Sequence, residues 1–377
     1  MKMAIHGLAT ALPKHSIEQA DAAEIARTFL TSAESARLLP ALFRRTQVRT
    51  RNSVLLETAK IQSNGHSNAI ADGHALGQTF YMPARDENDR GPATQQRMDR
   101  YAAEAGPLAL EAATGALKAA GIDPSEITHL ITVSCTGFFA PGVDIGLIND
   151  LPLPPTVGRL HVGFMGCHGA LNALRVAQSI VGDDPAAVVL IVAVELCSLH
   201  YQYGFDSDKL VANALFADGA AALVGRAQQA NGRVDSQRWK VVSSGSYLVP
   251  DSGDAMSWRI GDHGFQMTLS PRVPEWICQH LRPFLETWLK RSGRTIEEIA
   301  CWAVHPGGPR ILTSVAEALS LPTNAMEPSA AILAECGNMS SPTVLFVLER
   351  LWAQGARPPC VILGFGPGLV AEAALLE

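Results

Sequence analysis

The chain has 377 residues, of which 47% are hydrophobic and 18% charged, so it can bury a large core and is typical of a globular protein. Its formal net charge of −6 argues against a general nucleic-acid-binding protein, because neutralising phosphates requires a basic surface. The seven cysteines are odd in number and form no C-x-x-C pair, which argues against a disulfide framework or a zinc ribbon and favours a cytoplasmic location. We expect no signal peptide, because Pro13 interrupts the N-terminal segment, and no membrane span, because no apolar run approaches about 20 residues.

The predicted elements alternate between strands and helices along the chain. Residues 3–11 predict a strand, and residues 16–39 carry helical spacing. A basic cluster from Arg44 to Arg51 follows, and by itself it is more typical of a solvated surface helix or turn. Residues 62–95 are polar and rich in Gly, His, Asp and Pro, which favours a long surface loop. Further on, we predict a helix over residues 98–120, buried strands over 130–135 and 188–194, an Ala/Gly-rich run over 213–225 and a strand over 239–247.

A glycine-punctuated turn, Gly163-Phe164-Met165-Gly166-Cys167-His168-Gly169-Ala170, joins a predicted strand to a largely apolar helix. The turn places Cys167 at or near the N-terminus of that helix. The positive end of the helix dipole favours the thiolate there, and such cysteines reach pKa values of about 3.5–7.5, against about 8.5 when free. The alternative is an inert core cysteine, since free cysteine is among the most buried residue types.

The second half of the chain repeats the first after a shift of 171 positions (338 − 167) without gaps. The shift lays the strand at 130–135 on 301–306, and Cys167 on Asn338. Buried strands that alternate with helices predict sheets covered on both faces. We therefore predict an α/β protein of two duplicated βα halves, residues 1–230 and 231–377, packed around a pseudo-twofold axis.

The repeat also relates three reactive side chains. Cys167 and Asn338 begin equivalent helices, and His305 ends the strand equivalent to the one that carries Ser134. If the halves pack about the axis, a thiolate that accepts an acyl group can lie beside His and Asn N–H groups that stabilise a thioester enolate, with no metal required. Taken singly, His305 is more typical of a core histidine and Asn338 of a plain N-cap; their matching positions favour catalysis.

Five motifs then occur in an order found in one family. They are Gly166-Cys167, Leu215-Phe216-Ala217-Asp218-Gly219-Ala220-Ala221, His305-Pro306-Gly307-Gly308-Pro309, Gly337-Asn338-Met339-Ser340-Ser341 and Gly364-Phe365-Gly366-Pro367-Gly368. On these motifs the whole chain resembles the type III polyketide synthases, such as chalcone synthase and bacterial alkylresorcinol or alkylpyrone synthases. The resemblance implies a thiolase-like fold layered α-β-α-β-α and a homodimer. It also implies acyl-CoA and malonyl-CoA as substrates, without a further cofactor or an acyl carrier protein.

The resemblance also implies roles for individual residues. Cys167 would accept the starter acyl group, and His305 and Asn338 would drive decarboxylation of malonyl-CoA. Phe216 matches an aromatic gate between the CoA tunnel and the reaction cavity. The basic cluster lies where the family binds the CoA phosphates. The CoA-binding residues that we expect are Arg49, Arg51, Gly307 and Gly308.

Several cavity positions depart from the plant enzymes. The second gate aromatic falls on Met267, although Phe265 two residues away is an alternative. His200 replaces a cavity threonine, and Ala140 stands where a methionine reaches into the partner's cavity. Met267 and Ala140 favour an aliphatic acyl-CoA starter, whereas the bulkier His200 shortens the pocket. We expect two further cavity residues at Thr136 and Ser340.

We therefore expect an enzyme that loads an acyl starter, extends it with decarboxylated malonyl-CoA and cyclises the product to a resorcinol, phloroglucinol or pyrone. One alternative is a β-ketoacyl carrier-protein synthase of the fatty-acid initiating type, which uses the same three catalytic groups. The motifs after His305 and at the C-terminus argue against it. A second alternative is a non-catalytic partner subunit, but such subunits usually lack the nucleophile, and this chain keeps all three groups.

Overall fold

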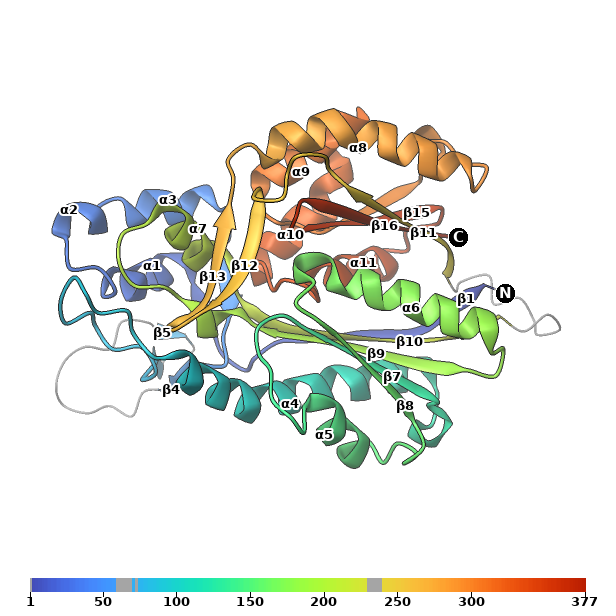
Figure 1. Ribbon diagram of the computed structural model, residues 1–377, viewed down its shortest axis with the longest axis horizontal. Coiled ribbons are helices and arrows are strands. Elements are labelled where there is room, and N and C mark those ends of the chain that lie inside the picture. The colour runs from blue at the N-terminus through green and yellow to red at the C-terminus, as the bar shows by residue number, and fades with distance from the viewer. Residues whose placement is uncertain (1, 59–69, 72–73, 229–238) are drawn as a thin grey trace.

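The chain folds into five layers in the order helix, sheet, helix, sheet, helix (Figure 1). The computed structural model describes residues 2–58, 70–71, 74–228 and 239–377. Among the described strands, the two sheet layers are the two halves of one nine-stranded sheet in the order β14-β15-β16-β11-β1-β10-β9-β7-β8. Its two halves join where β1 pairs with β11, through Met3–Val241 and Ala4–Lys240. The expected mixed α/β architecture is confirmed, and the expected boundary at residues 230 and 231 lies outside the described residues.

The first half contributes strands β7, β8 and β9, which run parallel to one another, and strands β10 and β1, which are antiparallel to their neighbours. Its elements are β1 (Met3–Ala11), α4 (Thr94–Ala120), β7 (His129–Ser134), α5 (Val143–Asp150), β8 (Gly158–Gly163), α6 (Gly169–Asp183), β9 (Val188–Leu196) and β10 (Asp218–Ala227).

The second half repeats this order, because parallel β14 and β15 are followed by antiparallel β16 and β11. The shift of 171 positions carries α6 onto residues 340–354, where α11 lies (169 + 171 and 183 + 171). The elements of this half are β11 (Lys240–Leu248), α8 (Val273–Lys290), β14 (Cys301–Val304), α9 (Pro309–Leu319), α10 (Glu327–Cys336), α11 (Thr343–Ala353), β15 (Cys360–Gly366) and β16 (Val370–Leu376).

Helices α6 and α11 form the central layer between the two half-sheets, while α4 and α8 cover the outer faces (Figure 1). Strand β9 is buried along its whole length, which explains its unbroken apolar sequence. The largely apolar α11 shares one core cluster with α6 and with strands of both halves. This packing brings the starts of the two central helices to the middle of the molecule.

Further helices and strands are inserted between these elements. Strands β12 and β13 form a two-stranded sheet of their own. The segment after Gly77 is not a plain surface loop as predicted, because Tyr81 is buried and packs against Phe29 and Tyr203. Residues 70–71 and 74–77 of that prediction form strands, and residues 62–69 and 72–73 lie outside the described residues. The inserted elements are β2 (Ser16–Glu18), α1 (Gln19–Arg27), α2 (Ala33–Ala36), α3 (Leu39–Arg45), β3 (Thr50–Asn52), β4 (Glu57–Thr58), β5 (Ile70–Ala71), β6 (His74–Gly77), α7 (Ser207–Leu215), β12 (Met256–Gly261) and β13 (Gly264–Leu269).

Candidate active site

Cys167 lies in a short 3₁₀ turn, Gly166–His168, that leads directly into α6. The turn is sharp because Gly166 has a φ of +71°, and a Cβ atom at this position would lie 2.6 Å from Cδ of Pro367. Only glycine therefore fits before the cysteine. The predicted strand–turn–helix context of Cys167 is confirmed.

The Cys167 thiol receives hydrogen bonds from two side chains of the other half. The Ser340 hydroxyl donates to its sulfur at 3.7 Å, and the Asn338 side chain is also hydrogen-bonded to it. Burial nevertheless raises the pKa of Cys167 to about 11, and the charge of Glu195 adds to the rise. The expected lowering of this pKa is wrong in direction, because burial outweighs the hydrogen bonds of Ser340 and Asn338.

Asn338 is held in place through its backbone and its side chain. Its N–H donates to the carbonyl of Leu215 and its carbonyl accepts from the N–H of Ala217, both at 2.9 Å. These two bonds form a parallel bridge to Phe216, which joins the expected gate residue to the expected catalytic amide. The Asn338 Oδ1 atom accepts the backbone N–H of Ser340 at 2.8 Å. The side-chain N–H groups therefore remain free to act as donors toward the thiol.

His305 follows β14 and is 1% exposed, yet neither of its ring nitrogens has a hydrogen-bond partner among the described residues. Burial lowers its pKa to about 3, and the neighbouring charge of His168 lowers it further. The imidazole is therefore neutral at pH 7. A neutral ring keeps one N–H donor and one acceptor nitrogen, so His305 can bind an oxygen atom or accept a proton.

A buried carboxylate, Glu195, lies beneath the site and was missed by the sequence reasoning. It accepts hydrogen bonds from the hydroxyls of Thr136 at 2.7 Å and Ser341 at 2.6 Å, and from the backbone N–H of Cys135 at 3.0 Å. Burial raises the pKa of Glu195. Its signal in the sequence was a lone carboxylate in the apolar run that ends β9.

Cys167 opens into a cavity of about 30 Å³ whose lining includes four of the predicted residues. Such a volume has room for two or three water molecules, at about 10–15 Å³ each. The indole of Trp258, which the sequence reasoning missed, also lines this cavity and donates its Nε1–H to the carbonyl of Cys135 at 2.7 Å. The predicted lining residues are Thr136, Phe216, Met267 and Ser340.

Two other predicted cavity residues, Phe265 and His200, do not line this cavity. Phe265 is 1% exposed and stacks on the ring of His200, with centroids 4.2 Å apart. His200 donates from Nε2 to the carbonyl of Thr136 at 2.7 Å and accepts the backbone N–H of Phe265 on Nδ1 at 3.0 Å. Both ring nitrogens of His200 are thus bonded to Thr136 and Phe265. Of Met267 and Phe265, Met267 is the residue that lines the cavity. The prediction that His200 shortens the pocket is wrong.

Ala140 is exposed and belongs to a separate cavity of about 270 Å³. This cavity is lined by the edge of the first half-sheet and by Phe138 and Phe139, which are 39% and 38% exposed. The single chain therefore does not bring Ala140 to the Cys167 cavity.

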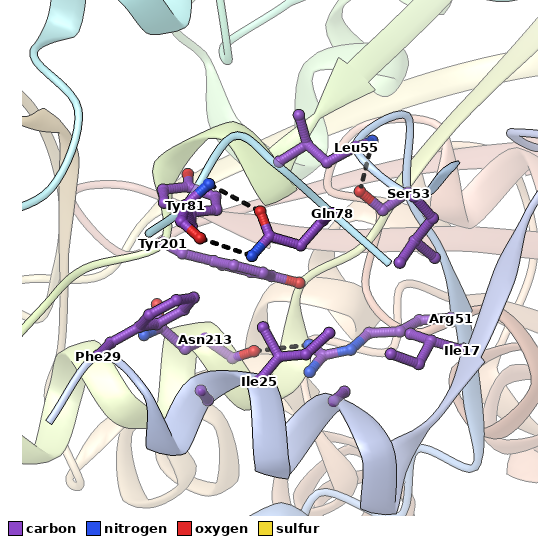
Figure 2. A pocket seen from close by; sticks show the side chains of 13 residues that line it. Ile17, Ile25, Phe29, Arg51, Ser53, Leu55, Gln78, Tyr81, Tyr201 and Asn213 are labelled. Carbon is purple, nitrogen blue, oxygen red and sulfur yellow. Dashed lines mark hydrogen bonds between the residues drawn. The ribbon is translucent and has the colours of Figure 1, made fainter. Parts of the chain in front are cut away.

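Arg51 is not available to a CoA phosphate, which corrects our expectation. The residue is 2% exposed, and its side chain donates to the carbonyl of Asn213 at 2.6 Å (Figure 2) and to that of Phe216 at 3.1 Å, at the end of α7. The guanidinium also lies over the rings of Phe43 and Tyr201. A cation suits the carbonyl end of a helix, so Arg51 supports the gate residue instead.

A third cavity, of about 410 Å³, lies beside the start of α9 and contains the predicted Gly307 and Gly308. Exposed Arg45 and Arg310 also line it. Arg49 is outside this lining; it is exposed, and its guanidinium lies 3.6 Å from the carboxylate of Glu335. The basic cluster thus contributes Arg45 to the cavity.

Within the described ranges, no group of three or more His, Cys, Asp or Glu side chains is placed to hold a metal ion. Among the helices of those same ranges, none is long and apolar enough to cross a membrane.

Comparison with known proteins identifies the family. The models for the N-terminal and C-terminal domains of chalcone and stilbene synthases match residues 85–228 and 240–377. The α-pyrone synthesis polyketide synthase-like Pks18 of Mycobacterium tuberculosis is 32% identical over 379 aligned residues, covering 99% of this chain and 90% of that protein. The 1,3,6,8-tetrahydroxynaphthalene synthase of Streptomyces peucetius is 38% identical over 275 residues, covering 72% of each chain.

Structural comparison agrees. The crystal structure of PKS-I from the brown alga Ectocarpus siliculosus superposes with a TM-score of 0.87 at 28% identity, covering 100% of this chain and 98% of that one. The chain therefore belongs to the chalcone and stilbene synthase family and is a type III polyketide synthase with a thiolase-like fold. Enzymes of this family are decarboxylating acyltransferases that use acyl-CoA and malonyl-CoA.

The raised pKa of Cys167 gives a pH dependence that can be measured. A thiol with a pKa of about 11 is mostly protonated at neutral pH, and only the thiolate is alkylated. The iodoacetamide rate at Cys167 should therefore rise about tenfold per pH unit from pH 7.5 to 9.5. Ser340→Ala should slow the reaction at each pH, because the hydrogen bond that it removes stabilises the thiolate.

Peptide mass spectrometry measures the rate at Cys167 separately from the exposed Cys278. A rate that levels off below pH 8 would contradict the raised pKa.

Proposed function

We propose that Cys167 carries the growing acyl chain and that His305 and Asn338 together bind the enolate formed from malonyl-CoA. The observation that carries this proposal is His305, a buried neutral imidazole without a hydrogen-bond partner in the described part of the chain. An unpaired buried polar group costs about 1–3 kcal/mol, so a role with a bound substrate accounts for it. Asn338 lies at the Cys167 thiol.

In the loading step, the sulfur of Cys167 attacks the carbonyl of an acyl-CoA thioester. The Cys167 proton passes to the free acceptor nitrogen of His305, and then to the departing CoA thiolate. Because burial disfavours a charged imidazole, His305 is neutral before and after the step and carries the proton only while the sulfur bears the compensating negative charge. The starter is then held as a thioester on Cys167.

In the extension step, malonyl-CoA loses CO₂ and becomes a thioester enolate. The N–H donors of His305 and Asn338 bind its oxyanion, in a buried site where such bonds are strong. The enolate carbon attacks the Cys167 thioester, a C–C bond forms, and the Cys167 thiolate leaves. We propose that repeated extension and ring closure give a resorcinol, phloroglucinol or pyrone.

We propose that CoA enters through the cavity beside α9. Arg45 and Arg310 are placed to meet its phosphates, and Gly307 and Gly308 lie on the same wall. Phe216 lines the Cys167 cavity, while Leu215 before it lines the CoA cavity. These neighbouring positions on the two cavities support Phe216 as the gate between them, the role that the family resemblance implies.

We further propose a cytoplasmic homodimer. Strand β8 is the edge of the large sheet, and exposed apolar side chains surround it, which is typical of a surface covered by another chain. The seven cysteines are all free, as in a reducing cytoplasm. A mass of a single 40.1 kDa chain in analytical ultracentrifugation would contradict the dimer. The exposed side chains are Phe138, Phe139, Leu160 and Met165.

The role of Cys167 is tested by two variants. Cys167→Ala should abolish condensation, because no thioester can form on the enzyme, while leaving the fold intact by circular dichroism. Cys167→Gln should still convert malonyl-CoA to acetyl-CoA, because His305 and Asn338 remain. Mass spectrometry of products from malonyl-CoA and a panel of acyl-CoA starters measures both reactions. Polyketide formed by Cys167→Ala at the wild-type rate would show that another group is the nucleophile.

The proposed CoA site is tested by comparing two neighbouring arginines. Arg45→Ala should raise the KM for malonyl-CoA about fivefold at unchanged kcat, because an exposed ion pair contributes up to about 1 kcal/mol. Arg44 is an exposed neighbour outside the lining of the cavity, so Arg44→Ala is the matched control and should change KM less than twofold. Equal KM values for the two variants would contradict the assignment.

A further inference from the structure

The cavity of about 30 Å³ at Cys167 holds less than a polyketide chain, so the position of its walls bears on how long a chain can grow there. Four of its lining residues come from the β12–β13 hairpin: Met256, Ser257, Trp258 and Met267. Trp258 and Met267 lie directly opposite each other in the hairpin register. The hairpin is therefore the wall that faces Thr136, Cys167 and Ser340.

The position of this wall depends on contacts outside the hairpin. Strands β12 and β13 pair only with each other among the described strands, and an isolated two-stranded ribbon is marginally stable in water. The middle of the hairpin is held by the bond from Trp258 to Cys135 and by the bond between Phe265 and His200. Its turn, between Gly261 and Gly264, is held by another element.

Thr94, the first residue of α4, makes three hydrogen bonds to that turn. Its backbone N–H donates to the carbonyl of Asp262 at 2.8 Å, its hydroxyl donates to the carbonyl of Gly261, and the same hydroxyl accepts the N–H of Gly264 at 2.8 Å. The first N–H groups of a helix have no partner within it, so the turn satisfies one of them. Helix α4 packs against β1, β9 and β10, which makes it a firm support.

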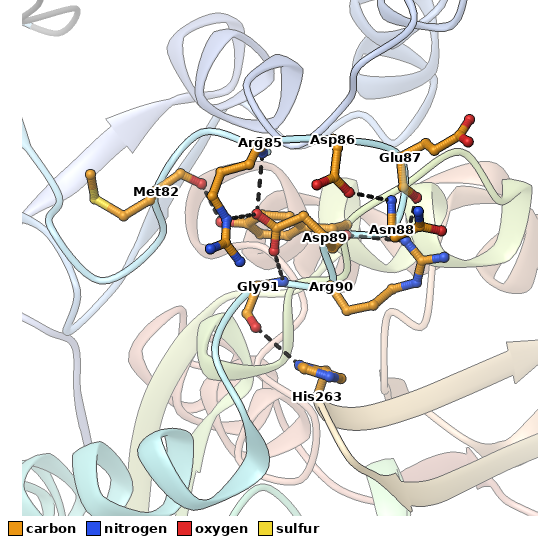
Figure 3. A network of polar contacts seen from close by, with 10 residues as sticks. Met82, Arg85, Asp86, Glu87, Asn88, Asp89, Arg90, Gly91 and His263 are labelled. Carbon is orange, nitrogen blue, oxygen red and sulfur yellow. Dashed lines mark hydrogen bonds and ion pairs between the residues drawn. The ribbon is translucent and has the colours of Figure 1, made fainter.

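The turn is also fixed on either side of Thr94. The His263 ring donates from Nδ1 to the carbonyl of Gly91 at 3.0 Å (Figure 3). Gly91 is itself held by Asp89, which accepts its N–H at 3.0 Å and also accepts Nε of Arg85 at 2.9 Å. A Cβ atom at Gly264, whose φ is +91°, would lie 2.8 Å from the Arg97 guanidinium. The turn is therefore pressed closely against α4.

We propose that Thr94 is a positioning residue that fixes the tip of the β12–β13 hairpin and so limits how far the Cys167 cavity opens and how many malonyl units are added. The inference rests on the proposed function, because it concerns the length of the chain built on Cys167. Thr94 acts through the hairpin and not by contact with the reacting atoms, so its effect should fall on the product and not on decarboxylation.

The test compares Thr94→Ala with Thr94→Ser and with Thr287→Ala, a control that removes one hydroxyl bond from an exposed position on α8. Thr94→Ala removes two bonds to the turn, so amide exchange over residues 261–269 should become about tenfold faster. The ratio of products with one additional extension to the main wild-type product should rise by a similar factor. Decarboxylation of malonyl-CoA should change less than about twofold, and Thr94→Ser should restore the wild-type ratio.

A folded Thr94→Ala enzyme with wild-type exchange and product ratio would overturn the inference, as would equal changes in Thr287→Ala. If Thr94→Ala does not fold, His263→Ala removes the separate bond to Gly91 and is judged by the same two measurements. A wild-type enzyme that makes no polyketide refutes the proposed function. If the wild-type enzyme makes polyketide and the variants give the same products as the wild type, only the role of Thr94 is refuted.

Discussion

Burial controls the chemistry of this site. It lowers the pKa of His305 to about 3 and raises that of Cys167 to about 11, so both groups are neutral at pH 7. The two residues therefore do not form an ion pair in this structure, although the sequence context of Cys167 favoured a thiolate. A neutral His305 with free nitrogens suits a site that must bind an oxyanion and also move a proton. The same low polarity strengthens each hydrogen bond made to a developing charge.

The duplicated architecture creates this burial. Helices α6 and α11 are enclosed between two half-sheets, and Cys167 and Asn338 lie just before them. One backbone bridge, between Phe216 and Asn338, ties the proposed gate to the catalytic centre. Arg51 supports that bridge from the opposite side by binding the carbonyl of Phe216. Arg51, which was predicted to bind CoA, therefore supports the backbone of the proposed gate residue.

The three proposed catalytic residues could be picked out from the sequence because each has a local signal. Cys167 follows a glycine turn, and Asn338 and His305 fall at matching positions of the repeat. The fold class followed from the same alternation of apolar strands and helices, and the family comparisons confirm it. These features depend on near neighbours or on the register of the repeat, both of which can be read along the chain.

The contacts of long side chains could not be read in this way. Arg51 has the composition of a surface cluster, but its partners are carbonyls more than 160 positions away. His200 was expected to shorten the pocket, yet it bonds Thr136, just after β7, and Phe265, in β13. The wall formed by Trp258 depends on where an entire hairpin docks, which no local pattern encodes.

The central claim, that His305 and Asn338 hold the malonyl-derived enolate, is tested most directly by CO₂ release from malonyl-CoA alone. Replacing one oxyanion donor costs about 10²–10³ in rate, so Asn338→Ala and His305→Ala should each lose decarboxylation to this extent. Asn324→Ala, at an exposed asparagine, is the matched control and should keep the wild-type rate. If Asn338→Ala and His305→Ala release CO₂ within about threefold of wild type, other groups bind the enolate and the account is wrong.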